Sequence, residues 1–402
     1  MENINYDYVI IGAGILGLTI AHELSNQDAS ASILLLEKES SIGKHGSGRN
    51  SGVLHSGVYY PENSLKAKFC ADGAKTMIKF CVENDLPLNR LGKIIVPLKE
   101  SDDSQLKLLF SRAKKNKANV SLIDDKQINE IEPEAYSITG QALYSPDTAV
   151  VEPKLILNKL LEKLVNRGVR VLFDQEVKSA DPEKSMINTE AYSVSYGFLY
   201  NVSGQCIDKV SKLFGVGNEY ITIPFKGKYY KLDKTKSDLK INGLIYPVPD
   251  LNVPFLGIHS VKTISNEVYF GPSAIIALGR ENYHGLDNVE IKDAIINGFY
   301  LAGQYIKDKQ GFRQYAANEM GRLFKHGFVE SVRQMIPGVN ENSLAACDKV
   351  GIRAQLFNVD TKELVMDFLF KKEENTLHVL NAVSPAFTSS FSMAKHLVSQ
   401  SQ

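Results

Sequence analysis

One segment close to the N-terminus constrains the fold more than any other part of the chain. In it, a short apolar run is followed by Gly12, Gly14 and Gly17 in the spacing Gly-x-Gly-x-x-Gly, then by a helical pattern and a second apolar run, 33–36, that ends at Glu37. This order is typical of a βαβ unit in which glycines and a helix N-terminus approach a pyrophosphate and an acid binds a ribose. Because the acid disfavours a ribose 2′-phosphate, we expect FAD or NAD and not NADP.

Composition excludes several classes of function. The chain has 402 residues, enough for two or three domains, and 46 basic residues balance 46 acidic ones. A long-range field that would gather nucleic acid is therefore absent, and no nucleic-acid partner is expected. The four cysteines form neither a Cys-x-x-Cys pair nor a metal-binding spacing, so we expect reduced thiols and no metal site: Cys70, Cys81, Cys206 and Cys347.

The first strand begins within a few residues of Met1, which leaves no room for a signal peptide. No apolar run approaches the roughly 18 residues that a membrane-spanning helix needs. We therefore expect a cytoplasmic protein, with peripheral contact to the inner face of a membrane left open.

The order of elements predicts an α/β fold, α+β overall. Helical patterns cover 65–83, a region starting at Pro153, and 291–335, whereas 101–132 is expected to form a solvated pair of outer helices. From residue 220 to 270, alternating strands broken by prolines indicate an antiparallel sheet.

The segments expected to meet the cofactor, 8–60, 169–206 and 350–390, are far apart in sequence. We therefore predict a discontinuous Rossmann-like FAD-binding domain with an inserted antiparallel-sheet substrate domain. The FAD-binding domain is expected to comprise 1–85, 145–215 and 340–402, and the substrate domain 86–144 and 216–339.

Several motifs in a fixed order carry a family resemblance over essentially the whole chain. They are the segments 50–60, 64–70, 245–250, 254–259, 351–355 and 377–386. With these motifs the chain resembles the D-amino-acid-oxidase-like FAD oxidoreductases, and within them the L-2-hydroxyglutarate dehydrogenase/oxidase family. The resemblance implies oxidation of L-2-hydroxyglutarate to 2-oxoglutarate by hydride transfer to flavin, with oxygen or a quinone as the electron acceptor.

The resemblance also implies noncovalent FAD. The cofactor-binding residues it implies are Gly12, Gly14, Gly17, Glu37, Lys38, Arg49, Asn50, Ser51, Gly52, Val177, Ser203, Gly204, Gly351, Ser384, Pro385 and Ala386. The last three would open the final helix, whose N-terminus can stabilise negative charge that develops on the flavin.

Oxidation of a 2-hydroxy acid needs a cation for the carboxylate and a base for the hydroxyl proton. Arg353 is expected to bind the α-carboxylate, because the wider family places an arginine at this Gly-Ile-Arg position and a guanidinium binds carboxylates with two hydrogen bonds. His259 or His55 is expected to be the base, with a slight preference for His259, which lies in a strand.

A second carboxylate would need a second cation. Lys226 and Arg280 are the candidates for this role, and the hydroxyl donors considered beside them are Tyr229, Tyr246 and Tyr283.

Two departures from the family pattern bear on the substrate. Arg49 stands where the family usually has histidine and is expected to place a cation near the flavin, whereas Lys228 reverses a charge. Two alternatives therefore stay open: oxidation of another small 2-hydroxy or amino acid, and a non-catalytic flavoprotein that serves as an assembly or binding factor.

Overall fold

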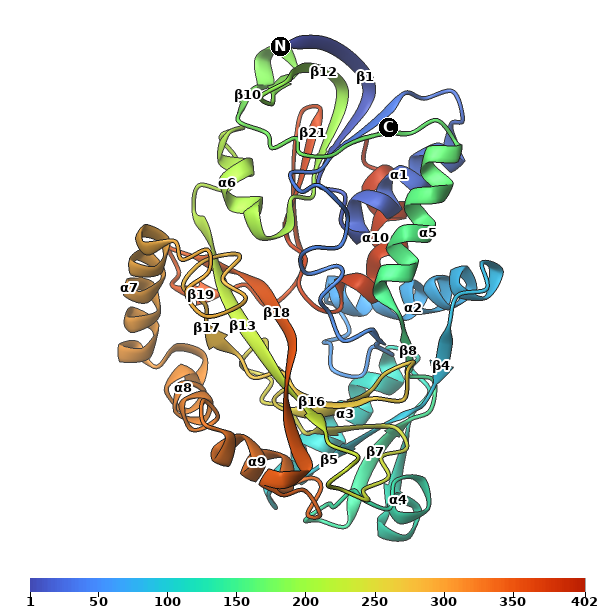
Figure 1. Cartoon of the computed structure of the whole chain (residues 1–402), viewed down its shortest axis with the longest axis vertical. Coiled ribbons are helices and arrows are strands. Elements are labelled where there is room, and N and C mark those ends of the chain that lie inside the picture. The colour runs from blue at the N-terminus through green and yellow to red at the C-terminus, as the bar shows by residue number, and fades with distance from the viewer. Residues whose placement is uncertain (402) are drawn as a thin grey trace.

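The computed structural model describes residues 1–401, and its largest sheet has eight strands. Five strands run parallel, and Figure 1 shows them in the part of the molecule that also carries both termini. They are β1 (Glu2–Ile11), β2 (Ile33–Leu36), β9 (Arg170–Leu172), β12 (Tyr192–Asn201) and β21 (Thr376–Asn381). Three antiparallel strands complete the sheet: β10 (Ser179–Asp181), β11 (Met186–Asn188) and β20 (Leu369–Glu373).

The apolar runs of β1 and β2 are continuous because both faces of this sheet are covered. Ile10 and Leu35 pack on one face against four helices, whereas Val9 and Leu34 pack on the other face in a separate core. The four helices are α1 (Ile15–Gln27), α2 (Leu65–Glu83), α5 (Pro153–Asn166) and α10 (Ala386–Val398). The short helix α6 (Ile207–Lys212) contributes Val210 to the second core.

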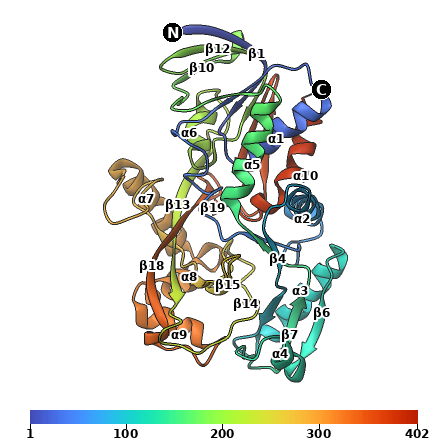
Figure 2. The same ribbon diagram turned by 45° about the vertical axis from the view of Figure 1, so that its right-hand side comes forward.

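A six-stranded sheet is built around a long antiparallel pair. β13 (Tyr220–Leu232) pairs with β18 (Leu344–Asn358) in a register that places Phe225 opposite Arg353. The other strands of this sheet are β15 (His259–Lys262), β16 (Val268–Gly271), β17 (Ile275–Ile276) and β19 (Glu363–Leu364). In Figures 1 and 2 three helices flank it on the outside of the molecule: α7 (Ile291–Lys307), α8 (Phe312–Gly321) and α9 (Lys325–Arg333).

Two smaller sheets complete the lower part of Figure 1. One contains β14 (Leu244–Pro247), β5 (Lys93–Val96), β7 (Gln141–Ser145) and β6 (Ser121–Asp124), and the other β3 (Val53–Leu54), β8 (Ala149–Val151) and β4 (Leu88–Arg90). Helices α3 (Asp102–Lys115) and α4 (Asp125–Ile131) lie beside them.

The expected pair of outer helices at 101–132 is wrong in one respect, because β6 separates α3 from α4. Val120 and Ile123 are buried and therefore hold this segment in the sheet despite its many charged neighbours.

The mixed architecture of a Rossmann-like sheet and an antiparallel sheet is confirmed. One predicted boundary is not. We expected the cofactor domain to resume at residue 340, but β18 pairs along nearly its whole length with β13 of the substrate sheet. The parallel sheet is rejoined only at β20 and β21. The rest of the division into domains stays a prediction.

Candidate active site

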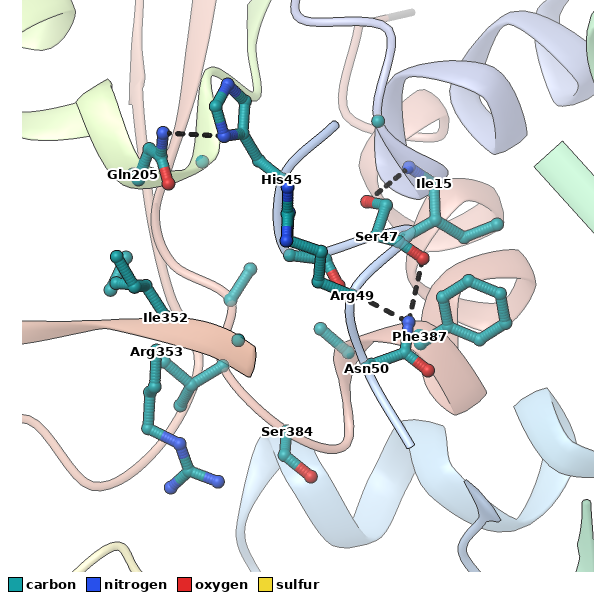
Figure 3. Close-up of a pocket in the computed structure, with 18 of the residues that line it drawn as sticks. Ile15, His45, Ser47, Arg49, Asn50, Gln205, Ile352, Arg353, Ser384 and Phe387 are labelled. Atoms are coloured by element: carbon teal, nitrogen blue, oxygen red, sulfur yellow. Dashed lines mark hydrogen bonds between the residues drawn. The ribbon is translucent and has the colours of Figure 1, made fainter. Parts of the chain in front are cut away.

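A large pocket lies where the carboxyl ends of β1, β2 and β12 meet the six-stranded sheet. Its wall takes residues from segments as distant in sequence as Gly12, Val177, Arg353 and Ser384. In Figure 3, Ile15 and His45 lie at one end and Arg353 lies at the other, so we call these the dinucleotide end and the substrate end.

The glycines at the dinucleotide end are required by close backbone contacts. Gly12 has a φ of +105°, and a Cβ atom on it would lie 2.7 Å from the carbonyl oxygen of Val202. A Cβ atom on Gly17 would lie 1.9 Å from the Gly12 carbonyl oxygen. Gly12 and Gly14 line the pocket, whereas Gly17 stands behind it and lets α1 approach the turn.

Glu37 is held in place at the end of β2. One carboxylate oxygen accepts a hydrogen bond from the Ala13 amide at 3.0 Å, and the other accepts one from the Glu39 amide at 3.0 Å. Each oxygen keeps a second lone pair for a further donor. Val177, Ser203 and Gly204 line the same end, where the resemblance implies an adenine contact for Val177 and a diphosphate-side contact for Ser203 and Gly204.

The loop 43–52 forms a second wall, and its Ser47 was missed in the sequence. The Ser47 hydroxyl accepts the Ile15 amide of the first turn of α1 at 3.0 Å, and Asn50 donates to the Ser47 carbonyl at 2.7 Å (Figure 3). Asn50 and Ser51 line the pocket; Gly52 does not, because it packs against the Val151 carbonyl. The pattern Gly-Ser-Gly at residues 46–48 was the feature of the sequence from which a role for Ser47 could have been predicted.

Arg49 lies in this loop but is directed away from the substrate end. Its guanidinium stacks 4.0 Å from the ring centroid of Tyr283 and donates to the Lys44 carbonyl at 2.6 Å. Figure 3 shows it pointing toward His45. Gly351 lets β18 pass this loop, since a Cβ atom there would lie 2.9 Å from the Arg49 carbonyl oxygen.

A polar cluster behind the loop was not predicted, apart from Lys38. Glu39, His45 and Glu281 lie close enough together for a metal ion, but the Lys38 ammonium contacts both carboxylates and supplies the positive charge. Gln205 donates to His45 at 3.0 Å and so ties the cluster to the loop after β12. Gln205 follows the predicted Ser203-Gly204 but carries no motif of its own.

The N-terminus of α10 opens onto the pocket. Ser384, Pro385 and Ala386 all line it, as the sequence predicts. Thr388, one turn further, accepts the backbone amide of His55 at 3.2 Å and so joins this helix to the loop after β3. A helix N-terminus placed here can stabilise negative charge in the pocket.

Arg353 dominates the substrate end. Its guanidinium lies 5.2 Å from the ring centroid of Phe255 and donates to the Pro254 carbonyl. Within residues 1–401 no carboxylate lies within 4.0 Å of the Arg353 guanidinium. Desolvation lowers the pKa of Arg353, because it disfavours the charged form. The half-buried guanidinium therefore has no anionic partner in the described chain, and a ligand carboxylate can pair with it.

His55 and His259 both line the pocket and are both buried. Burial lowers the pKa of His259 to about 4 and that of His55 well below 6.5, and the nearby charges of Lys93 and Arg353 add to both effects. Each imidazole is therefore neutral near pH 7. His259 Nδ1 lies 2.8 Å from the Gly257 carbonyl, which must accept its proton, so Nε2 carries none. His55 Nδ1 has no partner in the described chain.

Tyr229 and Tyr246 also line the substrate end, and no hydrogen bond occupies either hydroxyl within residues 1–401. The Tyr246 ring stacks on His259 with a centroid distance of 3.9 Å. Behind it, the ammonium of Lys93 lies 5.2 Å from the Tyr246 centroid, fully buried and without a hydrogen-bond partner in the described chain. Lys93 was not predicted as a residue near the site, because a lysine at the start of an apolar strand is normally expected at the surface.

The two cations predicted for a second carboxylate do not reach the pocket wall. Arg280 is wrong as a ligand because its guanidinium makes a buried pair with Asp208 at 2.6 and 2.9 Å. Lys226 alternates with Phe225 and Gly227 along β13 and donates instead to Asn282 at 2.6 Å. Lys228 is exposed on the same strand, so its reversed charge lies outside the pocket. Tyr283 also lies outside the wall, where it contacts His45 and Arg49.

Comparisons with known proteins agree with this geometry. The family model of FAD dependent oxidoreductases matches residues 7–400. L-2-hydroxyglutarate dehydrogenase of Indibacter alkaliphilus is 35% identical over 97% of this chain and 97% of its own length. The proteins of the same name from Escherichia coli K12 and, in mitochondria, Homo sapiens are each 31% identical over 99% of this chain, and over 93% and 89% of their own lengths.

Solved structures share the fold at low identity. The dithionite-reduced L-alpha-glycerophosphate oxidase of Mycoplasma pneumoniae with FAD bound has a TM-score of 0.77 at 18% identity, covering 100% of this chain and 95% of that one. Glycine oxidase of Geobacillus kaustophilus has a TM-score of 0.71 at 14% identity, covering 99% and 94%.

The dinucleotide end fits FAD on its own evidence. The backbone of the Gly12–Gly17 turn packs too closely for a Cβ atom on Gly12 or Gly17, Glu37 keeps lone pairs for a ribose, and the pocket continues without interruption to the N-terminus of α10. Together with the family match, these features confirm the predicted cofactor and the resemblance seen in the sequence. The chain belongs to the FAD dependent oxidoreductase family, and its cofactor is FAD.

Proposed function

We propose that this protein oxidises L-2-hydroxyglutarate to 2-oxoglutarate. The observation that carries the proposal is the half-buried Arg353 without a carboxylate partner, which shares one end of the pocket with two neutral histidines. Relatives of at least 31% identity over nearly the whole chain bear the name L-2-hydroxyglutarate dehydrogenase, which supports the choice of substrate.

Arg353 binds the α-carboxylate in this proposal. A guanidinium with free N–H groups can grip a carboxylate with two parallel hydrogen bonds and so fix the orientation of the α-carbon. Because Lys226 and Arg280 are engaged elsewhere, the hydroxyls of Tyr229 and Tyr246 are the donors available to the second carboxylate. Both hydroxyls stay protonated near pH 7, since burial raises their pKa values.

His259 removes the proton of the substrate hydroxyl. Its Nδ1–H donates to the Gly257 carbonyl, which leaves Nε2 as a proton acceptor, and its ring is held against Tyr246. FAD, when bound, supplies the hydride acceptor for the α-carbon. His55 lies beside Ser384 at 3.4 Å and is the alternative base. The depressed pKa of either imidazole keeps it unprotonated and ready to accept a proton.

FAD is held without a covalent bond in this proposal. Cys206 lines the dinucleotide end, but burial raises the pKa of its thiol and so suppresses the nucleophilic thiolate. Acid precipitation should release all flavin into the supernatant. The electrons then pass to oxygen or to a quinone, and the reaction takes place in the cytoplasm.

Anaerobic mixing tests the substrate. The purified yellow protein is mixed with each enantiomer of 2-hydroxyglutarate, with lactate, malate and glycolate, and with glutamate and proline, while flavin absorbance is followed. We expect rapid bleaching with L-2-hydroxyglutarate alone and stoichiometric 2-oxoglutarate. Bleaching by another acid would identify that acid as the substrate instead. If dithionite reduces the flavin but none of the acids does, a non-catalytic flavoprotein is favoured.

A further inference from the structure

Two buried lysines near the substrate end take no part in the reaction proposed above. Lys66, in the first turn of α2, is 7% exposed, and Lys93, the first residue of β5, is 1% exposed. Within residues 1–401, neither ammonium donates a hydrogen bond or has a carboxylate within 4.0 Å. A buried ammonium reduces stability unless an anion or a hydrogen-bond acceptor pairs with it, so two unpaired ones in one region call for an explanation.

Aromatic rings connect Lys93 to the pocket wall. Its ammonium lies 4.5 Å from the ring centroid of Tyr59 and 5.2 Å from that of Tyr246, and Tyr246 lines the pocket. An aromatic face attracts a cation weakly but carries no net charge. The charge of Lys93 therefore stands one side chain behind the wall and is not neutralised there.

Lys66 reaches the same region from α2. Its ammonium lies 5.9 Å from the ring centroid of Tyr60, the neighbour of Tyr59 in sequence. After desolvation, repulsion by Arg353 is the largest cause that lowers the pKa of Lys66, and the charge of Lys66 in turn lowers the pKa of His55. Arg353 and His55 both line the substrate end, so Lys66 acts on that end from behind.

Two carboxylates of the protein could offset this positive charge, but other groups engage both. Asp367 attracts Lys66 from beyond 4.0 Å, while its oxygens accept two backbone amides at the start of α2 at 2.7 and 3.0 Å. Glu319, on the pocket wall, pairs with Arg322 at 2.5 Å and accepts a backbone amide at 2.6 Å. With Arg353, the region thus holds three cations that have no carboxylate within 4.0 Å in the described chain.

We propose that Lys66 and Lys93 make the substrate end prefer a dicarboxylate to a monocarboxylate. The inference rests on the proposed function, because it assigns both lysines a role toward the second carboxylate of L-2-hydroxyglutarate. Arg353 pairs with the first carboxylate, and the hydroxyls of Tyr229 and Tyr246 offer the second one hydrogen bonds but no charge. The lysines supply the missing charge through the wall, where the low dielectric makes Coulomb attraction stronger than in water.

The protonation of the two lysines fits this role. Burial lowers the pKa of each to about 7, so each is partly protonated near pH 7 in the protein alone. A bound dianion favours the ammonium form of both. A monocarboxylate paired with Arg353 brings no second charge and gains nothing from them.

A pair of substrates that differ only in the second carboxylate tests the proposal. The FAD-loaded protein is assayed with L-2-hydroxyglutarate and with the analogue in which a neutral amide replaces that carboxylate. We expect kcat/KM of the wild type to be at least about 100-fold higher for the diacid. Lys66→Met and Lys93→Met should each lower this ratio about tenfold, through a higher KM for the diacid alone. Lys68→Met, at an exposed lysine of α2, is the matched control and should keep the wild-type ratio.

The ratio separates an electrostatic role from a structural one. Damage to packing would lower kcat/KM for both compounds alike and leave the ratio unchanged, so a wild-type ratio in both methionine variants overturns the proposal. Where a methionine variant does not retain flavin, the glutamine variant at the same position is measured in its place. Failure of the proposed function gives another result: the wild type then oxidises neither compound, which overturns both proposals.

Discussion

The two ends of the pocket satisfy their charges in different ways. At the dinucleotide end, Lys38 contacts Glu39 and Glu281, and Glu37 accepts two backbone amides. At the substrate end, Arg353 and Lys93 have no carboxylate within 4.0 Å in residues 1–401. The charges at the dinucleotide end are therefore paired within the protein, whereas the Arg353 guanidinium on the wall of the substrate end remains free to pair with a ligand anion.

The largest effect expected from this comparison is loss of the cofactor. Gly17→Ala places a methyl group 1.9 Å from the Gly12 carbonyl oxygen and should yield a colourless protein, because α1 can no longer approach the turn. We expect FAD affinity to fall at least about tenfold. Gly298→Ala in α7, where the methyl meets no atom within 4 Å, is the control. Full flavin absorbance in Gly17→Ala would show that backbone geometry is not what holds FAD.

The next effect concerns the base at the substrate end. His259→Gln should slow flavin reduction by roughly 10²–10⁴-fold with FAD content unchanged. Burial lowers the pKa of His259 to about 4, so the wild-type rate should stay constant from pH 8 to 6 and fall only as pH approaches 4. Stopped-flow absorbance measures both. If His55→Gln produces the loss and His259→Gln does not, the two histidines exchange roles.

Arg353→Lys probes the unpaired cation directly. A lysine keeps the charge but cannot form two parallel hydrogen bonds, so KM for the 2-hydroxy acid should rise about 10–100-fold while FAD content stays constant. Lys228→Glu changes a charge on the exposed side of β13 and should leave KM unaltered. An effect of Lys228→Glu equal to that of Arg353→Lys would mean that general charge, and not a specific grip, attracts the substrate.

The smallest effect concerns stability. Burial lowers the pKa of Lys93 to about 7, so the unfolded chain binds a proton between pH 7 and 10 that the folded chain does not. Lys93 therefore does not reduce the free energy of unfolding above the pKa of the unfolded chain, and it reduces that free energy increasingly as the pH falls toward 7. Lys93→Met should raise the free energy of unfolding at pH 7 by about 1–3 kcal/mol, and by less at pH 9, in urea titrations. Lys236→Met, at an exposed lysine, should change neither value.

The two ends also differed in how far sequence could predict them. Gly12, Gly17 and Glu37 lie in one continuous segment whose conformation depends on local backbone geometry, so a pattern in the sequence could predict the turn; Gly12 and Glu37 line the pocket, and Gly17 stands behind it. The substrate end is assembled from β13, β15, β18 and the loop after β3, and only tertiary pairing brings these together.

Errors followed from the same cause. Arg280 and Lys226 have the right chemistry, but Asp208 and Asn282 occupy them, and no spacing in the sequence reveals those pairings. Lys93 lies in β5 beside β14, so its contact with Tyr246 depends on a strand pairing between residues far apart in the chain. Sequence therefore supplied the residue types, whereas pairing decided which of them face the pocket.

The position of β21 and α10 bears on how the protein is made. β1 pairs with β12, β12 pairs with β21, and α10 packs against α1 and α2 in one core. β1 is synthesised first, but the face of its sheet that packs against α10 is covered only after this last helix has been synthesised. Contacts of such high sequence separation form slowly and late. A truncated chain that lacks β21 and α10 would keep the glycine turn but would have an incomplete cofactor site. Flavin binding therefore requires a chain that has been synthesised through α10.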